Sequence, residues 1–231
     1  DDNFTFKRKR VDKIFDRIEQ RGYKLDFRIR SRVTFVDDEF LDRYKKIGGR
    51  AVSYGMESGS DRVLKLMDKR TSVEANKKAC LSTKRAGLIC QSTWIAGWPG
   101  ETIEDLNRTF QFIRKYVPTT FSFAILYPLP GTPVYEEAKE KGTLQGEWSV
   151  TTPDKPYVRT EQWPEREDLG RYIARQQLLL QLNPKFVLQT LLLILRERNM
   201  GLVTYGLTVI FRNTLYTLKT LATLPFAKQG N

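Results

Sequence analysis

The sequence predicts an α/β fold in which about four parallel strands form a sheet or partial barrel, followed by a C-terminal helical appendage. Apolar runs begin near residues 24, 51, 88 and 120 and alternate with helical patterns, and their mean spacing of about 32 residues fits repeated strand–helix units. Three of the runs end in turns of small and polar residues, AVSYGMESGS, STWIAGWPGET and FSFAILYPLPGT. Because ligands bind at the carboxyl ends of parallel strands, we expect these turns to line one site.

The composition limits the chemistry that this chain can perform. With 231 residues, 40% of them hydrophobic, it can bury one large core, alone or with an appendage. It contains no histidine, which excludes imidazole acid–base chemistry, Ser–His and Cys–His nucleophile pairs and most transition-metal sites. Catalysis must therefore depend on carboxylates, hydroxyls, Tyr, Lys or Arg, or on a bound cofactor.

The two cysteines and the first residues of the chain each give one expectation, about metal binding and about the extent of the chain. Cys80 and Cys90 match no zinc, thioredoxin or iron–sulfur spacing, and we expect them to be buried structural thiols. The chain opens with Asp1 and Asp2, without an initiator Met or a signal-peptide pattern, so we expect a fragment with about two strands missing upstream. The two acids could bind a metal or a cationic group, but helix capping is the simpler interpretation.

The N-terminal region predicts one helix and one strand. Residues 7–21 place apolar side chains on one helical face, and Gly22 ends the helix. Residues 24–32 alternate apolar and charged side chains, as a strand with one wet face does. Arg28, Arg30 and Arg32 would share one side of that strand, as a salt-bridge ladder or as a clamp for an anion.

The central region continues the alternation of strands and helices. Capping residues, apolar periodicity and glycine stops predict three strands, over 51–57, 88–96 and 119–127. They also predict helices over 37–47, from about 60, over 71–86, from residues 101–105 onward and over 133–141. Lys65, Lys69 and Arg70 lie towards the end of the helix from about 60, where their positive charges suit the helix dipole.

The C-terminal region is basic and rich in leucine. Residues 143–164 lack a sustained period and are predicted to form a linker or lid, with helices over 165–182 and from 184 to 198. From Arg171 onward there are eight Lys or Arg against one acid, Glu197, which leaves +7 of the net charge of +12 in this part. The apolar stretch 199–211 is too short to cross a bilayer. We expect the tail helices to lie on a surface, either an anionic membrane or the domain itself. An acidic partner, or a solvated basic surface without any partner, also fits the charge. Nucleic acid fits poorly, because the aromatic residues cluster in strands and in the Leu-rich tail and not among the basic residues.

Each strand-end turn has both a binding and a structural interpretation. Glu57 can accept a hydrogen bond from an amine or a ribose diol, but SGSD is also ordinary helix-capping sequence. The turn over 97–102 could be a tight turn before a capped helix, and the Pro-Leu-Pro-Gly segment from Pro128 could be a strand breaker. The three turns are specific only as an ordered set.

That ordered set resembles the core of the radical S-adenosylmethionine (radical SAM) enzymes, especially the branch with an upstream cobalamin-binding domain and the related methylthiotransferases. The resembling segments are DDNF, SRVTFVD, YGMESGSDRVLKLMDKRTS, IAGWPGETIEDLNRTF and YPLPGTPVYEEAKEKG. The resemblance implies a TIM-like partial (β/α)6 barrel, of which residues 1–142 would supply the last four strands. Residues 143–164 would then be a linker or lid, and residues 165–231 a separate helical tail.

The resemblance also implies a site for SAM. Asp1 and Asp2 would lie near the amino group of the SAM methionine, and Arg32 near its carboxylate. Glu57 and Ser58 would occupy the ribose motif. The remaining positions would surround the adenine: Ile95, Gly97, Glu101, Tyr127, Pro128 and Leu129.

The chain departs from the family at its start. The family's CxxxCxxC loop, which holds the 4Fe-4S cluster, is absent, so the resemblance implies that this chain is inactive alone and that its cluster ligands and cobalamin domain lie elsewhere. It implies a cytoplasmic enzyme for radical methylation or related C–H functionalisation, with a methylthiotransferase as one alternative. The Leu-rich tail favours a small-molecule or lipid-like substrate of apolar character, and peripheral contact with the inner face of a membrane. A second alternative is a non-catalytic module that binds a membrane surface.

Overall fold

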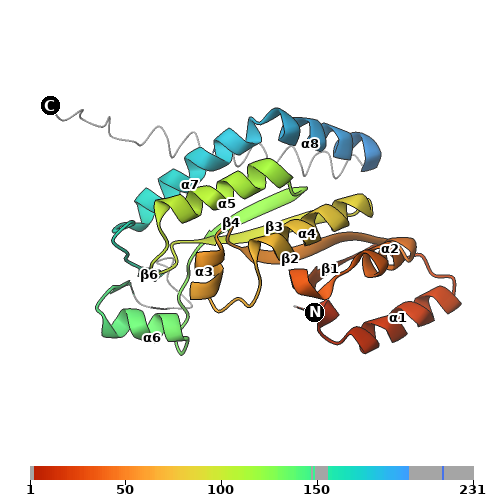
Figure 1. Cartoon of the computed structure of the whole chain (residues 1–231), viewed down its shortest axis with the longest axis horizontal. Coiled ribbons are helices and arrows are strands. Elements are labelled where there is room, and N and C mark those ends of the chain that lie inside the picture. The colour runs from red at the N-terminus through yellow and green to blue at the C-terminus, as the bar shows by residue number, and fades with distance from the viewer. Residues whose placement is uncertain (1–2, 147, 149–155, 198–214, 216–231) are drawn as a thin grey trace. The chain divides into compact units, whose positions relative to one another are not determined.

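The computed structural model describes residues 3–146, 148, 156–197 and 215, and the chain divides into two compact units, residues 1–158 and 159–231. The first unit contains a four-stranded parallel sheet in the order β1-β2-β3-β4 (Figure 1). Its strands are β1 (Phe27–Ser31), β2 (Gly49–Glu57), β3 (Ile89–Ala96) and β4 (Thr120–Ile125). The predicted α/β fold with four parallel strands is therefore confirmed.

Helices follow the strands in the alternation that the sequence predicts. The helices of the first unit are α1 (Arg8–Gln20), α2 (Asp38–Lys46), α3 (Asp61–Leu66), α4 (Val73–Arg85), α5 (Ile103–Tyr116) and α6 (Pro133–Glu140). Two short 3-10 helices, Phe4–Phe6 and Val33–Phe35, precede α1 and α2.

Capping side chains fix where several helices begin. The Asp37 side chain accepts a hydrogen bond from the Phe40 backbone N–H at 2.7 Å, and that of Ser72 accepts one from Ala75 at 3.2 Å. Thr102 and Asp105 form a reciprocal capping box at the start of α5. These starts were predictable because each cap satisfies backbone donors that the first helical turn leaves unpaired.

One face of the sheet is covered by helices and holds the core of this unit. The Tyr54 hydroxyl of β2 lies 2.7 Å from the Thr83 hydroxyl of α4. On β3 and β4, the rings of Trp94 and Phe123 pack against α5, with a Phe110–Phe123 centroid distance of 4.8 Å. Residues at alternate strand positions point to the opposite face.

The region 143–164 contains structure that its sequence did not indicate. Strands β5 (Leu144–Gln145) and β6 (Tyr157–Val158) pair in antiparallel fashion. Val158 is buried in a small apolar cluster with Leu126 and Ala138. Two-residue strands are too short to show a period of two, so sequence periodicity could not find them.

The second unit contains the predicted pair of helices, α7 (Arg166–Gln181) and α8 (Pro184–Glu197). The side chain of Asn183 accepts a hydrogen bond from the Lys185 backbone at 2.9 Å, as expected of a cap before Pro184. The apolar stretch 199–211 lies outside the described residues. Within the part of the chain that is described, no helix is long and apolar enough to span a bilayer.

Candidate functional site

The parallel register brings the ends of the four strands to one edge of the sheet. Ser31 of β1 pairs with Tyr54 of β2, and Ala96 of β3 pairs with Ile125 of β4. The loops that follow these strands therefore start along the same edge, as the sequence predicts. Asp1 and Asp2, the first predicted site residues, lie outside the described residues.

Glu57 and Arg32 meet at this edge through Lys69, a residue that the sequence did not predict to belong to the site. The Lys69 ammonium donates to Glu57 Oε1 at 2.7 Å, and Arg32 Nη2 donates to the Lys69 backbone carbonyl at 2.5 Å. Lys69 lies in the loop between α3 and α4. Two predicted site residues are thus joined by one loop residue.

The backbone around Glu57 is shaped to hold this pair. Glu57 has a φ of 61°, in the left-handed region, and the register of β2 against β3 shifts between Gly55 and Glu57 as in a β-bulge. A Cβ atom on Gly55 would lie only 2.3 Å from Glu57 Oε1. Glycine at residue 55 therefore leaves the space over the strand that the Glu57 carboxylate occupies.

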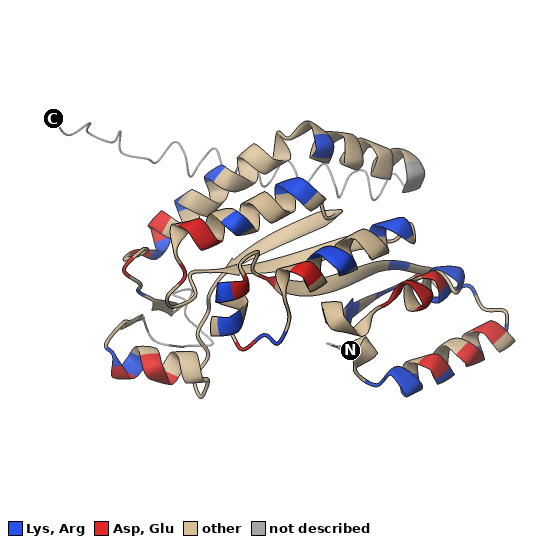
Figure 2. Ribbon diagram, viewed as in Figure 1, with Lys and Arg blue, Asp and Glu red and all other residues tan. Residues whose placement is uncertain are grey.

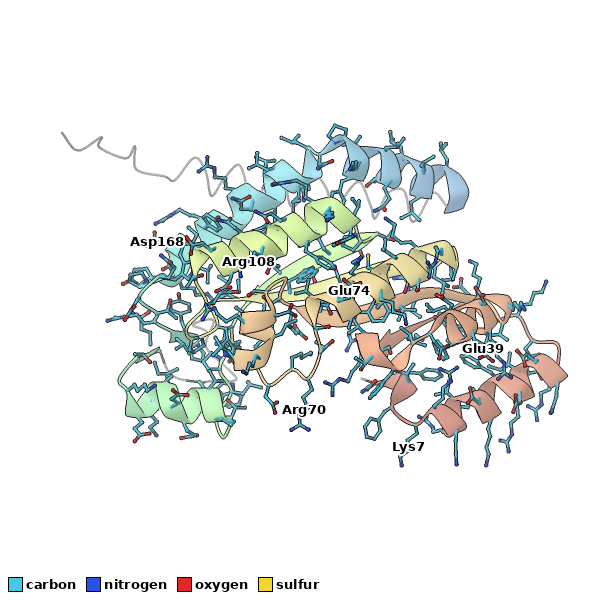
Figure 3. All side chains as sticks on the ribbon, in the orientation of Figure 1. Lys7, Glu39, Arg70, Glu74, Arg108 and Asp168 are labelled. Atoms are coloured by element: carbon cyan, nitrogen blue, oxygen red, sulfur yellow. The ribbon has the colours of Figure 1, made fainter. Side chains whose placement is uncertain are left out.

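The sequence-based interpretation of Lys69 and Arg70 as helix-dipole partners is wrong. Helix α3 ends at Leu66, so neither residue is in its last turn. Arg70 is 78% exposed, pairs with Asp68 and projects away from the ribbon (Figure 3). Lys69 turns inward instead, and only the tertiary structure distinguishes these two neighbouring cations.

Ser58 and Ser60 point into the protein. Ser58 is fully buried, and its hydroxyl lies 3.4 Å from that of Thr109 on α5 and accepts from the Ser60 backbone at 3.1 Å. The Ser60 hydroxyl donates to Asp105 Oδ1 at 2.6 Å. Both hydroxyls fasten the turn after β2 to α5, and Ser60 makes no side-chain cap of α3.

Asp105 connects the turn after β2 with the turn after β3. Its buried carboxylate accepts from Ser60, Thr102 and Arg62, and Arg62 Nη2 also donates to the Gly100 carbonyl at 2.6 Å. Burial alone would raise the pKa of Asp105, but the hydrogen bonds from Arg62, Ser60 and Thr102 hold it well below its usual range. Asp105 is ionised at neutral pH and positions both turns.

Glu101 supports the turn after β3 from inside. It is 2% exposed, and its Oε2 accepts from the Gly97 backbone N–H at 2.7 Å. Its Oε1 has no hydrogen-bond partner among the described residues. Burial raises the pKa of Glu101 to about 7, despite the hydrogen bond from Gly97.

The remaining predicted positions lie at the ends of β3 and β4. Ile95 packs against the apolar cluster around Leu126. Pro128 is buried, Tyr127 is half-buried and Leu129 is 47% exposed. The Leu129 carbonyl accepts from the Thr132 hydroxyl at 2.6 Å, which fixes the turn before α6.

A comparison with protein families identifies this arrangement. The sequence profile of the radical SAM superfamily matches residues 2–113, which contain β1 to β3 and their strand-end turns. These residues, just under half of the chain, are similar to the radical SAM superfamily. Members of this superfamily are enzymes that use SAM and a 4Fe-4S cluster.

Curated relatives and solved structures agree with this similarity. The chain is 28% identical over 190 residues to an uncharacterized methyltransferase of Pyrococcus horikoshii, covering 82% of this chain and 41% of that protein. It is 28% identical over 143 residues to the anaerobic magnesium-protoporphyrin IX monomethyl ester cyclase of Rubrivivax gelatinosus, covering 61% and 26%. The chain therefore spans less than half the length of either relative.

A solved radical SAM methyltransferase shares the fold. The protein TsrM of Kitasatospora setae, whose structure contains a tryptophan substrate and a SAM analog, superposes with a TM-score of 0.56 at 21% identity. The match covers 69% of this chain and 33% of TsrM. The likeness supports the barrel-type arrangement of the four parallel strands.

The two cofactors fit this chain differently. The edge with Glu57, Lys69 and Arg32 offers a carboxylate and cations of the kind that suit a nucleoside with an amino-acid group. Cys80 and Cys90 are both fully buried, and the described residues contain no group of three or more His, Cys, Asp or Glu side chains placed to hold a metal. The residues described here therefore do not fit a 4Fe-4S cluster.

Proposed function

We propose that residues 1–142 form the SAM-binding portion of a cobalamin-dependent radical SAM enzyme that methylates or otherwise functionalises a C–H bond. The observation that supports this most directly is the meeting of Arg32, Lys69 and Glu57 at the strand ends. The turn from Gly97 to Glu101 lies at the same edge. The methyltransferase among the relatives supports the type of reaction.

Each residue of this edge has a distinct task in the proposal. The bond to Lys69 uses one oxygen of Glu57 and leaves Oε2 to accept from a ribose hydroxyl. Lys69 fixes the orientation of that carboxylate. The Gly97 turn, braced by Glu101, offers small residues and backbone groups to the adenine. When bound, SAM supplies the reactive group, and these residues bind and orient it.

Titration of SAM into the full-length, cluster-reconstituted protein tests this proposal. Replacing Glu57 with alanine removes a charge-assisted hydrogen bond, and we expect SAM affinity to fall about tenfold or more. Lys69→Met should weaken binding less, because Glu57 remains but loses its orientation. Isothermal titration calorimetry measures both effects.

The matched control is Glu74→Ala. Glu74 pairs with Lys77 on α4 and its side chain is 75% exposed, so SAM affinity should not change. Unchanged affinity in Glu57→Ala would remove Glu57 from the site. Failure of the wild-type protein to bind SAM would refute the proposed function itself.

The use of cobalamin is separately testable. We expect the full-length protein to retain cobalamin through gel filtration, seen in its visible absorption spectrum. A protein that binds SAM and a cluster but no cobalamin would favour the methylthiotransferase alternative. In this chain the helices α7 and α8 follow the barrel strands, where methylthiotransferases usually carry a small β domain, and this difference favours the cobalamin-dependent enzyme.

A peripheral membrane role is a second candidate, supported by α8. Leu188, Leu191, Leu192 and Leu195 are 53–71% exposed and recur at helical spacing along one stripe. With the excess of basic residues after Arg171, such a stripe suits an anionic lipid surface. In this proposal the protein works in the cytoplasm, at the inner face of the membrane.

Sedimentation with lipid vesicles tests the membrane candidate. The full-length protein should bind phosphatidylserine-containing vesicles at low salt and dissociate as salt screens the attraction. Leu191→Glu combined with Leu192→Glu should abolish binding, whereas Leu66→Glu, at an exposed leucine of the first unit, should not. Equal behaviour of the two variants would refute the role of α8.

A further inference from the structure

The sheet face opposite the helices, which we call the open face, is lined mainly by polar residues at alternate strand positions. The strand register arranges them in rows. One row runs across all four strands through Arg30, Ser53, Gln91 and Thr120, and the next row joins Gly55, Thr93 and Ser122.

Burial distinguishes the open face from the covered face residue by residue. Thr93, Thr120 and Ser122 are exposed, and Ser53 and Gln91 are half-buried. Their neighbours along the strands, such as Tyr54 and Trp94, are fully buried. The two faces therefore have opposite chemistry, although parallel strands covered on both faces usually read as continuous hydrophobic runs.

This composition is unsuited to a packed barrel interior. Closed barrels fill their interior with layers of bulky branched side chains. Here hydroxyls, one amide and the glycine at residue 55 occupy the two central rows, between the apolar pairs Ala51–Ile89 and Ile95–Ala124. The central rows therefore leave both volume and hydrogen-bonding capacity. The Thr93 hydroxyl already donates to the Tyr54 carbonyl at 3.4 Å. An apolar occupant would remove water from the other polar groups of these rows, at a cost of roughly 1–3 kcal/mol for each group left without a hydrogen bond.

The charge on the open face is concentrated on β1. Arg28 and Arg30 are both exposed there, whereas β3 and β4 contain no charged residue (Figure 2). A guanidinium group matches the geometry of a carboxylate or phosphate. Glu57 and Lys69 lie at the strand-end edge of the same face, over Gly55.

We infer that the open face binds the substrate, and that this substrate is a polar small molecule with an oxyanion group directed towards Arg28 and Arg30. The inference rests on the proposed function, because SAM at the strand ends would lie beside this face. It favours a polar substrate over the apolar one that the Leu-rich tail suggested. The hydroxyls of Ser53, Thr93 and Ser122 would bind the uncharged polar groups.

Thiol labelling of the full-length protein tests this inference without knowledge of the substrate. Cysteine is introduced at residue 53 or at residue 122, and three methanethiosulfonates are compared: anionic sulfonatoethyl, cationic trimethylammonium-ethyl and apolar benzyl. Peptide mass spectrometry gives each rate, expressed relative to free cysteine. The native Cys80 and Cys90 are fully buried and should react slowly.

We expect the anionic reagent to be favoured over the cationic one about tenfold in Ser53→Cys. The preference should be smaller in Ser122→Cys, because two strand spacings place residue 122 about 10 Å further from β1. Arg28→Gln combined with Arg30→Gln should abolish the preference, and the matched pair Arg28→Lys and Arg30→Lys should retain it. The lysine pair separates a local charge effect from altered folding.

Two results would overturn the inference. One is the fastest relative reaction with the benzyl reagent, which would indicate an apolar site. The other is an anion preference that survives removal of both arginines, which would assign it to the net charge of the whole protein. SAM titration of the same variants is a separate measurement. Failed SAM binding would refute the proposed function, whereas the labelling rates alone decide whether the open face prefers an anion.

Discussion

Glu101 is a carboxylate that the fold withdraws from water. Its side chain is 2% exposed, one oxygen holds the Gly97 backbone and the other lacks a partner among the described residues. Burial raises its pKa from 4.5 to about 7. Between these values the folded protein holds a proton on Glu101 that the unfolded chain has released, so stability decreases as pH rises through this range.

We predict that Glu101→Gln removes this pH dependence. A neutral amide oxygen can still accept from Gly97, but no proton is lost on raising the pH. From pH 4.5 to 7, the free energy of unfolding of Glu101→Gln should rise relative to wild type by about 2–3 kcal/mol. Urea unfolding at several pH values measures this difference. Glu104→Gln, at an exposed position in the first turn of α5, should show none.

At the scale of elements, the turns after β2 and β3 are held together by side chains rather than by sheet hydrogen bonds. Asp105 of α5 binds Ser60 from one turn and Thr102 from the other, and Arg62 links the same carboxylate to Gly100. A Cβ atom on Gly59 would lie 2.6 Å from Thr109 Cα. The first turn therefore packs directly on α5, which fixes the position of Glu57 nearby.

Asp105→Asn should loosen both turns. Asparagine offers one acceptor oxygen instead of two and no charge for Arg62, so we expect a loss of about 2 kcal/mol in the free energy of unfolding. Because the folded pKa of Asp105 lies below 3.8, its contribution is present above that pH and is lost as pH falls further. On acidification, the free energy of unfolding of Asp105→Asn should therefore fall less than that of the wild-type protein. Asp42→Asn, at an exposed position on α2, is the control.

At the scale of the molecule, β1 and β4 are the two edge strands of the sheet that the described residues form. Both cysteines lie on the covered side of the sheet, Cys80 on α4 and Cys90 on β3, and both are fully buried in the core. In the first unit, the polar and charged groups that could bind a ligand therefore lie at the strand ends and on the open face. A cluster, if present in the full-length protein, must use ligands outside the described residues.

Reconstitution with iron and sulfide should give different results for this chain and for the full-length protein. We predict that the chain alone shows no 4Fe-4S absorption after desalting, because both thiols are fully buried. The full-length protein should acquire the absorption. A stable cluster in the chain that disappears in Cys80→Ser or Cys90→Ser would contradict this.

Local patterns were enough to predict most elements and several of their caps. The helices, the four parallel strands and the turns that follow β2, β3 and β4 correspond to runs and caps of a few neighbouring residues. The strand-end turn motifs also indicated the resemblance to the radical SAM superfamily, because each motif is a short local segment and their order along the chain can be read directly. The strands β5 and β6 were missed because two residues cannot show a period.

The sequence by itself determined the order of strands and helices, the places where turns begin and the family that these turns resemble, because each depends on residues close together in the chain. Only the tertiary structure decided that Lys69 meets Glu57 across 12 residues, that Ser60 meets Asp105 across 45, and that Ser58 is buried while Lys69 turns inward. Those contacts follow from strand register, a bulge and one left-handed backbone angle, which no local pattern specifies.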